Sequence, residues 1–257
     1  MSSSSKSKIK EQREYNVVKA NELIQNSRFN LNLQEQKIIL YLISKIKPSD
    51  TNLEEYSFDI QNFCQVCGID YDNGKNYQNL KKTLQDLHNK SLWVKINNKT
   101  EILFSWISGA AIINEGNGIV QIRLHESMAP YLLELQKNFT KYGLIYILAM
   151  KSQYSIRFYE TLKSCENLHR KTFTVDELKK AFMCERGSYN NFNNFKTYVL
   201  DIAMKEINTL TDISIEYNTL KEGKKVTQVE FTIKLKTEIT ERLKTFAEIE
   251  KILDNES

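Results

Sequence analysis

Proline and glycine are scarce in this chain, with 2 and 8 residues among 257. Loop-rich and barrel-like chains need many turn residues, so this scarcity favours long regular elements. No apolar run approaches the ~18 residues that a membrane-spanning helix requires. The opening residues, Met-Ser-Ser-Ser-Ser-Lys-Ser-Lys, lack the apolar core of a secretion signal. We therefore expect a soluble, cytoplasmic protein without a membrane partner.

Histidine is rare as well, because only His88, His125 and His169 occur and no two lie within 30 residues of each other. A metal-dependent nicking enzyme of the rolling-circle type needs a His-hydrophobic-His pair to hold its ion beside a tyrosine nucleophile. The Gly-rich phosphate loop of ATPases is also absent. The sequence therefore predicts no catalytic site and no cofactor.

Cysteine occurs four times, and only Cys64 and Cys67 form a CxxC pair. No second CxxC and no paired histidine follow at the spacing of a zinc site. We expect free and mostly buried thiols, as is usual in a reducing compartment, and no metal.

The charge is unevenly distributed along the chain. Residues 141–237 carry 16 basic and 11 acidic side chains, an excess of +5, whereas residues 238–257 carry 3 basic and 6 acidic ones. An acidic end thus masks part of a basic body in the overall charge of +4. A local basic surface is typical of proteins that bind a phosphate backbone, although many basic faces are only solvated.

Apolar spacing predicts the same order of elements in both halves, after a flexible tail over residues 1–15. In the first half we expect helices in 16–25, 33–46, 58–67 and 75–90, a β-hairpin of 91–96 and 101–108, and a strand at 118–124. In the second half we expect helices in 152–165, 175–183 and 191–208, and a hairpin of 213–219 and 226–235.

An offset of 115 residues aligns the two halves and indicates an internal repeat. Phe58, Ile60 and Phe63 fall on Phe173, Val175 and Leu178. The next helix shares its apolar stripe and two further identities: Lys81 and Asp86 fall on Lys196 and Asp201. The order helix, turn, helix, hairpin predicts a winged helix, whose third helix enters the major groove of DNA.

Helical geometry predicts which side chains of the third helices point outward. If Phe195, Val199 and Ile202 are buried, the third helix of the second half presents candidate DNA-binding residues on its outer face and flanks, and the hairpin that follows adds lysines. The candidates of the second half are Asn193, Asn194, Lys196, Thr197, Lys205, Lys221, Lys224 and Lys225. The candidates of the first half, on the helix of residues 75–90, are Lys75, Gln78, Asn79 and Lys82. For a single helix of this kind, a solvent-exposed face without a ligand is the simpler interpretation. Two such helices, each followed by a lysine-bearing hairpin, favour DNA binding.

Longer stretches resemble a known family. Val17-Val-Lys-Ala-Asn-Glu-Leu-Ile, Ser152-Gln-Tyr-Ser-Ile-Arg-Phe-Tyr-Glu, Phe173-Thr-Val-Asp-Glu-Leu and Phe195-Lys-Thr-Tyr-Val-Leu-Asp-Ile-Ala-Met-Lys carry the likeness, over about residues 16–236. The chain is similar to the replication initiator (Rep) proteins of theta-replicating plasmids with repeated origin sites, the iterons. Those proteins usually carry two or three basic residues directly after the phenylalanine matched by Phe195, whereas this chain has Lys196, Thr197 and Tyr198.

The resemblance implies two tandem winged-helix domains. With the element order, we expect a mainly helical α+β protein with domains at 16–136 and 137–257, the second ending in an acidic C-terminal helix that lies outside the resemblance. The resemblance implies binding of double-stranded iteron DNA, origin opening and repression of the initiator's own gene. It also implies a homodimer in equilibrium with a monomer, and contacts to the host replication initiator and the replicative helicase. A winged-helix transcriptional repressor, a nicking or primase-like enzyme and an interaction scaffold without DNA are the alternatives.

The first prediction concerns strand cleavage. Supercoiled origin plasmid incubated with the pure protein and Mg²⁺ or Mn²⁺ should stay unnicked, because the sequence offers no His pair to hold an ion. Agarose gels resolve nicked from supercoiled plasmid. Specific nicks that disappear after a Tyr→Phe substitution would contradict the binding-only interpretation.

Overall fold

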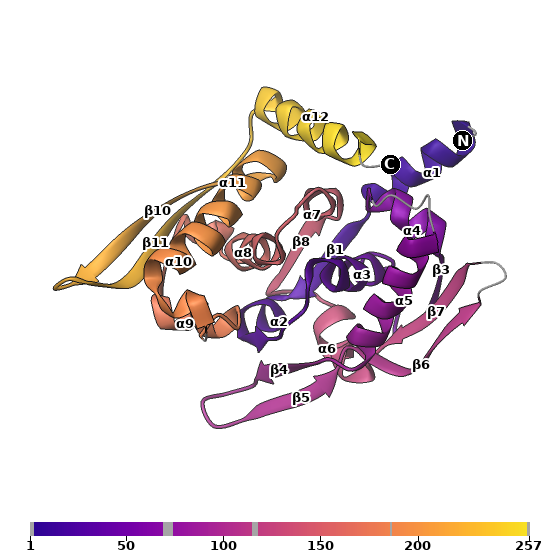
Figure 1. Ribbon diagram of the computed structural model, residues 1–257, viewed down its shortest axis with the longest axis horizontal. Helices are drawn as coiled ribbons and strands as arrows, with labels where there is room; N and C mark the ends of the chain where they lie inside the picture. Colours follow the sequence, from indigo (N-terminus) through magenta and orange to yellow (C-terminus); the bar gives the residue numbers. More distant parts are fainter. Residues whose placement is uncertain (1–2, 69–73, 115–117, 186, 256–257) are drawn as a thin grey trace.

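The computed structural model describes residues 3–68, 74–114, 118–185 and 187–255, and Figure 1 shows them as two adjoining modules. The N-terminal module contains α1 (Ser3–Arg13), β1 (Asn16–Ala20), α2 (Asn21–Asn26), β2 (Ser27–Arg28), α3 (Leu33–Ile43), β3 (Glu55–Asp59), α4 (Ile60–Val66), α5 (Gly74–His88), β4 (Ser91–Lys95), β5 (Glu101–Ser105), β6 (Ile107–Asn114), β7 (Ile119–Leu124) and α6 (Ala129–Leu132).

The remaining elements build the C-terminal module and the strand that joins it to the first. They are β8 (Phe139–Gly143), α7 (Ile145–Leu148), α8 (Gln153–Lys163), β9 (Arg170–Thr174), α9 (Val175–Ala181), α10 (Phe192–Phe195), a π-helical turn (Lys196–Leu200), α11 (Asp201–Leu210), β10 (Ile213–Glu222), β11 (Lys225–Leu235) and α12 (Ile239–Asn255). None of the described helices is both long and apolar enough to span a bilayer.

The two modules share one sheet topology. In the first, the antiparallel strand order is β3-β7-β6, and in the second it is β9-β11-β10. Each first strand leads directly into a helix capped by a side chain: Asp59 accepts from the N–H of Asn62, and Thr174 accepts from the N–H of Glu177. These two caps lie 115 residues apart, which is the offset of the repeat in the sequence. The shared strand order and the matching caps confirm the predicted α+β class and tandem winged-helix fold.

The wing of the first module is not the hairpin that the sequence predicts. The predicted hairpin forms as β4 and β5, but β4 pairs on its other side with β2. The strand pair β6–β7 occupies the position of the β10–β11 wing, because β7 pairs with β3 as β11 pairs with β9. The β4–β5 hairpin is therefore an addition between the third helix and the wing.

Two N-terminal expectations need correction. Residues 3–13 of the predicted flexible tail form α1, which is anchored because Ile9 is buried and the guanidinium of Arg13 donates to the carbonyl oxygens of Gln65 and Val66 at the end of α4. Residues 16–20, predicted to be helical, form β1 with alternating burial. Pairing of β1 with β8 overrides the helical spacing of these residues.

The strand pair β1–β8 also joins the two sides of the predicted boundary at residues 136 and 137. Strand β8 follows this boundary in sequence but pairs with β1, the first strand of the chain. The division into domains of 16–136 and 137–257 stays a prediction.

A buried ion pair fixes α8 against this strand pair. Lys19 of β1 lies 2.7 Å from a carboxylate oxygen of Glu160 of α8, and the Tyr142 hydroxyl of β8 donates to the same oxygen at 2.7 Å. The side chains of Lys19 and Glu160 are only 3% and 2% exposed. Burial lowers the pKa of Lys19, and the charge of Glu160 opposes that shift.

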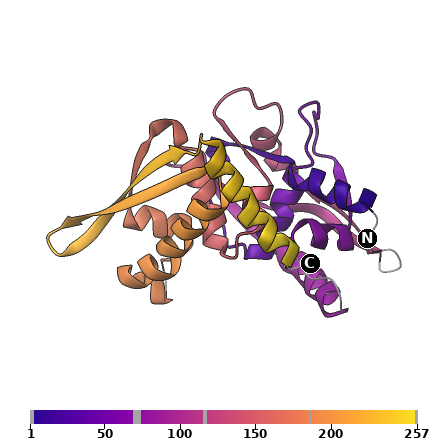
Figure 2. The same cartoon turned by 90° about the horizontal axis from the view of Figure 1, so that it is seen from above.

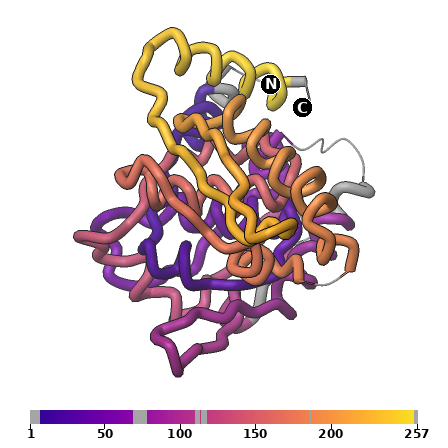
Figure 3. Tube along the Cα trace, turned by 90° about the vertical axis from the view of Figure 1, so that its left-hand side faces the viewer, coloured from indigo at the N-terminus to yellow at the C-terminus, as the bar shows by residue number. Residues whose placement is uncertain are grey.

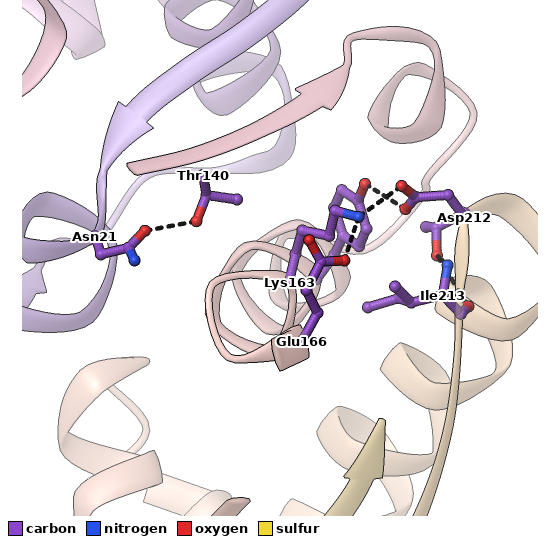
Figure 4. A network of polar contacts seen from close by, with 8 residues as sticks. Asn21, Thr140, Lys163, Glu166, Asp212 and Ile213 are labelled. Carbon is purple, nitrogen blue, oxygen red and sulfur yellow. Dashed lines mark hydrogen bonds and ion pairs between the residues drawn. The ribbon is translucent and has the colours of Figure 1, made fainter. Parts of the chain in front are cut away.

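A second polar network ties α8 to the C-terminal module (Figure 4). Asp212, in the turn before β10, accepts from the Tyr159 hydroxyl and from the Lys163 ammonium, each at 2.8 Å. Lys163 also pairs with Glu166. On the other side of the same view, Thr140 of β8 donates to Asn21 at the start of α2. Helix α8 of the C-terminal module is therefore bonded both to Asp212 of its own module and, through Glu160, to β1 of the first module.

Helix α12 returns from the second module to the first, and its end lies beside α1 in two perpendicular views (Figures 1 and 2). Ile249 and Leu253 are buried, and Arg13 lies 3.3 Å from Asp254. Leu253 packs so closely on Gly68 that any side chain at position 68 would collide with Leu253. The φ of Gly68, +65°, also favours glycine. The predicted acidic C-terminal segment is thus a docked helix.

The second prediction tests the buried pair. Glu160→Gln should lower the free energy of unfolding by about 3 kcal/mol, because it leaves the Lys19 charge buried without a counter-charge. The double variant Lys19→Met/Glu160→Gln should recover part of that loss. Urea unfolding followed by circular dichroism measures both, and equal stability of the single and double variants would show that the unpaired Lys19 charge does not cause the loss.

Candidate nucleic-acid interface

The third helix of the second module begins with a side-chain cap and contains a π-helical turn. Asn191 accepts from the N–H of Asn193 at 2.8 Å, which starts α10. The chain then passes through the π turn into α11 without leaving the helix, and the helix lies alongside the β10–β11 hairpin (Figure 3). Its inner face packs into the core through fully or nearly fully buried side chains, namely Phe195, Val199, Leu200, Ala203, Met204 and Ile207.

The outer face differs from the prediction at one apolar position. Ile202, expected to be buried beside Val199, is 40% exposed, and Leu200 and Ala203 are buried instead. The π turn adds a residue to one turn of the helix and so shifts which positions face the core. Thr197 and Lys205 are exposed, as predicted, and Tyr198 is exposed beside them.

Lys196 and Asp201 are bonded to each other. The ammonium of Lys196 lies 2.8 Å from one carboxylate oxygen of Asp201, and the Tyr217 hydroxyl of β10 donates to the other at 2.5 Å. Burial alone would raise the pKa of Asp201, but the hydrogen bonds from Lys196 and Tyr217 lower it. The basic residue nearest the start of the helix is thus paired with a carboxylate of the same face.

The asparagines at the start of the helix have different surroundings. Asn194 donates to the carbonyl oxygen of Ser188 at 2.9 Å and is committed to the preceding turn. Asn193 is exposed and lines a groove of about 580 Å³ between the start of α9, the start of α10 and the tip of the wing, where β11 begins. Lys224 and Lys225 line the same groove. Three of the predicted residues therefore surround one open space.

The wing presents lysines at its tip. Strands β10 and β11 are joined through Gly223, whose φ of +61° favours glycine, and the ladder shifts register between Leu220 and Lys221. The side chains of Lys221, Lys224 and Lys225 are all exposed. In Figure 1 this hairpin projects beyond α9 and α10, so its tip can reach a partner that the helix also touches.

The first module offers a smaller set on α5. Leu80, Leu84 and Leu87 are buried, which leaves Gln78, Asn79 and Lys82 exposed on the other side of the helix. Lys75 lies in the first turn of α5, but its side chain falls outside the described residues, and so does the tip of the β6–β7 wing. This set and the set on the second module lie on separate helices and do not form one cluster.

Sequence reasoning missed two features of this interface. The exposure of Tyr198 and Ile202 depends on the π turn, for which the sequence gives no signal. Lys179 of α9 is held by the carbonyl oxygen of Asn190 at 2.8 Å, and so braces the segment that leads into α10.

The described residues include no cluster of three or more His, Cys, Asp or Glu side chains suited to a metal ion. Burial raises the pKa of the Cys64 and Cys67 thiols to about 12, so the CxxC pair is protonated at neutral pH.

The repeated order of strand, helix, third helix and wing defines a tandem winged-helix protein. The chain belongs to the replication initiator protein family: the profile described as "Initiator Replication protein, WH1" matches residues 16–163, and that described as "Initiator Rep protein, WH2" matches residues 174–233. The first match extends beyond residue 136, and α1 and α12 lie outside both.

Two individual proteins are similar to the chain. The first is an uncharacterized 27.6 kDa protein of Escherichia coli, 26% identical over 119 residues, which are 46% of this chain and 49% of that protein. The chain thus matches about half the length of this curated relative. The second is the Pi initiator protein, solved as a crystal structure in complex with iteron DNA. It has a TM-score of 0.68 and 20% identity over 88% of this chain and 99% of that one.

Proposed function

We propose that this protein initiates plasmid replication by binding repeated origin sequences, the iterons, in double-stranded DNA. The observation that carries the proposal is the pairing of two initiator-family winged helices in one chain, the second with an exposed third helix beside a lysine-tipped wing. The Pi initiator, which shares this fold, is described in complex with iteron DNA. We place the protein in the cytoplasm, where plasmid DNA lies.

In this proposal, some candidate residues contact phosphates and others contact base edges. Lys221, Lys224 and Lys225 carry flexible ammonium groups at the wing tip, which suit phosphate contacts and the release of counterions. The third helices carry amide, hydroxyl and ammonium groups that can read base edges in the major groove. We assign this role to Asn193, Thr197 and Lys205 in the second module and to Lys75, Gln78, Asn79 and Lys82 in the first. Lys196 and Asn194 belong to the same surface but are held by partners within the chain.

Origin opening would follow from binding without catalysis. A protein that bends or untwists its site spends least energy where the duplex is most deformable, and AT-rich steps meet that condition. The proposal therefore includes distortion of an AT-rich stretch beside the iterons. A winged-helix transcriptional repressor is the alternative, and the two differ in whether adjacent DNA is opened.

A direct test uses the DNA that flanks the gene. The full chain should bind direct repeats of roughly 20 base pairs, about two helical turns, in that DNA. On a supercoiled plasmid it should make the thymines of the neighbouring AT-rich stretch reactive to permanganate. Footprinting and primer extension measure both. Binding without permanganate reactivity would favour the repressor, and equal affinity for repeats and random duplex would reject both functions.

We also propose that the protein forms a homodimer in equilibrium with a monomer. Strand β5 is an edge of the sheet β2-β4-β5, and unpaired edges can pair with another chain. On this hairpin Trp93 and Leu103 are opposite each other and 39% and 50% exposed, an apolar pair that a second copy could cover. Repression of its own gene, and contacts to the host replication initiator and the replicative helicase, rest on the family relationship alone.

The third prediction concerns this dimer. Leu103→Asp should shift the equilibrium toward the monomer, because it places a charge in the proposed apolar contact while changing a half-exposed side chain. Sedimentation velocity over a range of concentrations measures the shift. Leu243→Asp is the matched control, since Leu243 is 62% exposed on α12. An unchanged dimer fraction in Leu103→Asp would place the interface elsewhere.

The fourth prediction separates backbone affinity from sequence reading. Alanine at Lys221, Lys224 or Lys225 should weaken binding to repeats and random DNA alike, and should lower the salt slope by about 0.9 per lost phosphate contact. Alanine at Asn193 or Thr197 should cost about 1–3 kcal/mol against the repeat where the side chain touches a base edge, and much less against random DNA. Fluorescence anisotropy at several salt concentrations distinguishes the two patterns. Equal losses on both DNAs from the helix variants would remove residues 191–208 from the reading role.

A further inference from the structure

The outer face of the third helix in the second module carries two exposed apolar side chains. Tyr198 is 58% exposed and Ile202 is 40% exposed. They are four residues apart and so lie on the same side of the helix, one turn from each other. Neither belongs to the residues to which the phosphate and base-edge roles were assigned.

Charge around these two side chains is largely compensated. Asp201, the acidic residue between them, accepts hydrogen bonds from Lys196 and from the Tyr217 hydroxyl. Thr197 and Lys205 are exposed on the same face. The centre of this helix face is therefore apolar and nearly neutral, whereas its surroundings, including the lysines of the wing tip, are basic.

Duplex DNA presents an apolar group of matching size in the major groove. Of the base edges exposed there, only thymine carries a methyl group, and apolar side chains recognise it by contact. One helical turn spans about 5–6 Å along the helix axis, which is close to two base-pair steps of about 3.4 Å each. Two side chains at positions i and i+4 can thus contact methyl groups on separate thymines.

We propose that Tyr198 and Ile202 are specificity-determining residues that read thymine 5-methyl groups in the major groove. The inference rests on the proposed function, because it requires this helix to enter duplex DNA. The occupant is DNA rather than a protein because exposed lysines accompany the apolar pair: Lys205 lies on the same helix, and the wing strand β10, which contacts this helix through Tyr217 and Asp201, leads to the lysines of the wing tip. These residues belong to the part of the chain that carries a charge excess of +5.

Replacement of thymine by deoxyuridine isolates the proposed contact. Uracil pairs with adenine as thymine does, and only the methyl group is lost. The probe is a set of 30-base-pair duplexes selected by the full-length protein from a random library, in which each thymine is then replaced singly by deoxyuridine. Affinity is measured for the wild type and for Tyr198→Ala, Ile202→Ala and Tyr198→Phe, with Leu243→Ala on α12 as the control for loss of an exposed apolar side chain.

For the wild type, we expect deoxyuridine at one or two positions to weaken binding by about fourfold each, as expected for one buried methyl group. Tyr198→Ala should lose the sensitivity at one position and Ile202→Ala at another. Tyr198→Phe and Leu243→Ala should keep both. Because the substituted side chains are exposed, circular dichroism should show folded variants.

Two results would overturn the inference while leaving the proposed function standing. One is a selected duplex whose affinity for the wild type does not change at any deoxyuridine position. The other is a methyl effect of equal size in the wild type and in both alanine variants, which would show that Tyr198 and Ile202 do not contact the methyl groups. A selection that yields no preferred sequence would instead reject the proposed function, and the inference with it.

Discussion

The arrangement of the two modules depends on one buried ion pair. Lys19 and Glu160 meet at 2.7 Å in the interior, and the Tyr142 hydroxyl donates to the same carboxylate, so β1, β8 and α8 are held by a single oxygen atom. A charge pair in such surroundings is stable only with close geometry and additional hydrogen bonds, which leaves little freedom for the three elements to slide. Because α8 also packs against α11 and bonds to Asp212, this constraint reaches the helix proposed to read DNA.

Under the proposed function, that rigidity would let two small winged helices act together on one DNA site. Each third helix would recognise a few base pairs, and a fixed distance between the two makes the combined site longer and more selective than either alone. The helix and wing of the second module also differ in chemistry: three exposed lysines lie at the hairpin tip, whereas the helix face combines Lys205 with polar and apolar groups.

The terminal helices extend this scheme beyond the matched family regions. Arg13 of α1 donates to the end of α4 and pairs with Asp254 of α12, while Leu253 packs on Gly68. The C-terminal helix of the second module is thus attached to the first module at a second site, formed by Arg13 and Gly68 and separate from the Lys19–Glu160 pair. Two separate attachments resist rotation between the modules better than one, because a single contact leaves a hinge.

The sequence by itself determined the parts that local patterns encode. Amphipathic spacing located α3, α5, α8 and α9, alternation located both predicted hairpins, and the 115-residue offset paired the capped helices that begin after Asp59 and Thr174. Exposed lysines at the wing tip and exposed polar groups on α5 also followed from periodicity, since such positions depend only on which face of an element is buried.

Only the tertiary structure decided which distant segments meet. Residues 16–20 have a helical pattern but become a strand because β8 offers them a partner, and the first module's wing is β6–β7 because β7, not β5, pairs with β3. The pairing of Lys196 with Asp201, the π turn that exposes Ile202, and the docking of α1 on α12 likewise depend on packing between elements. Local sequence sets the periodicity of a segment, but the free energy that selects its partner comes from contacts that form only when the whole chain has folded.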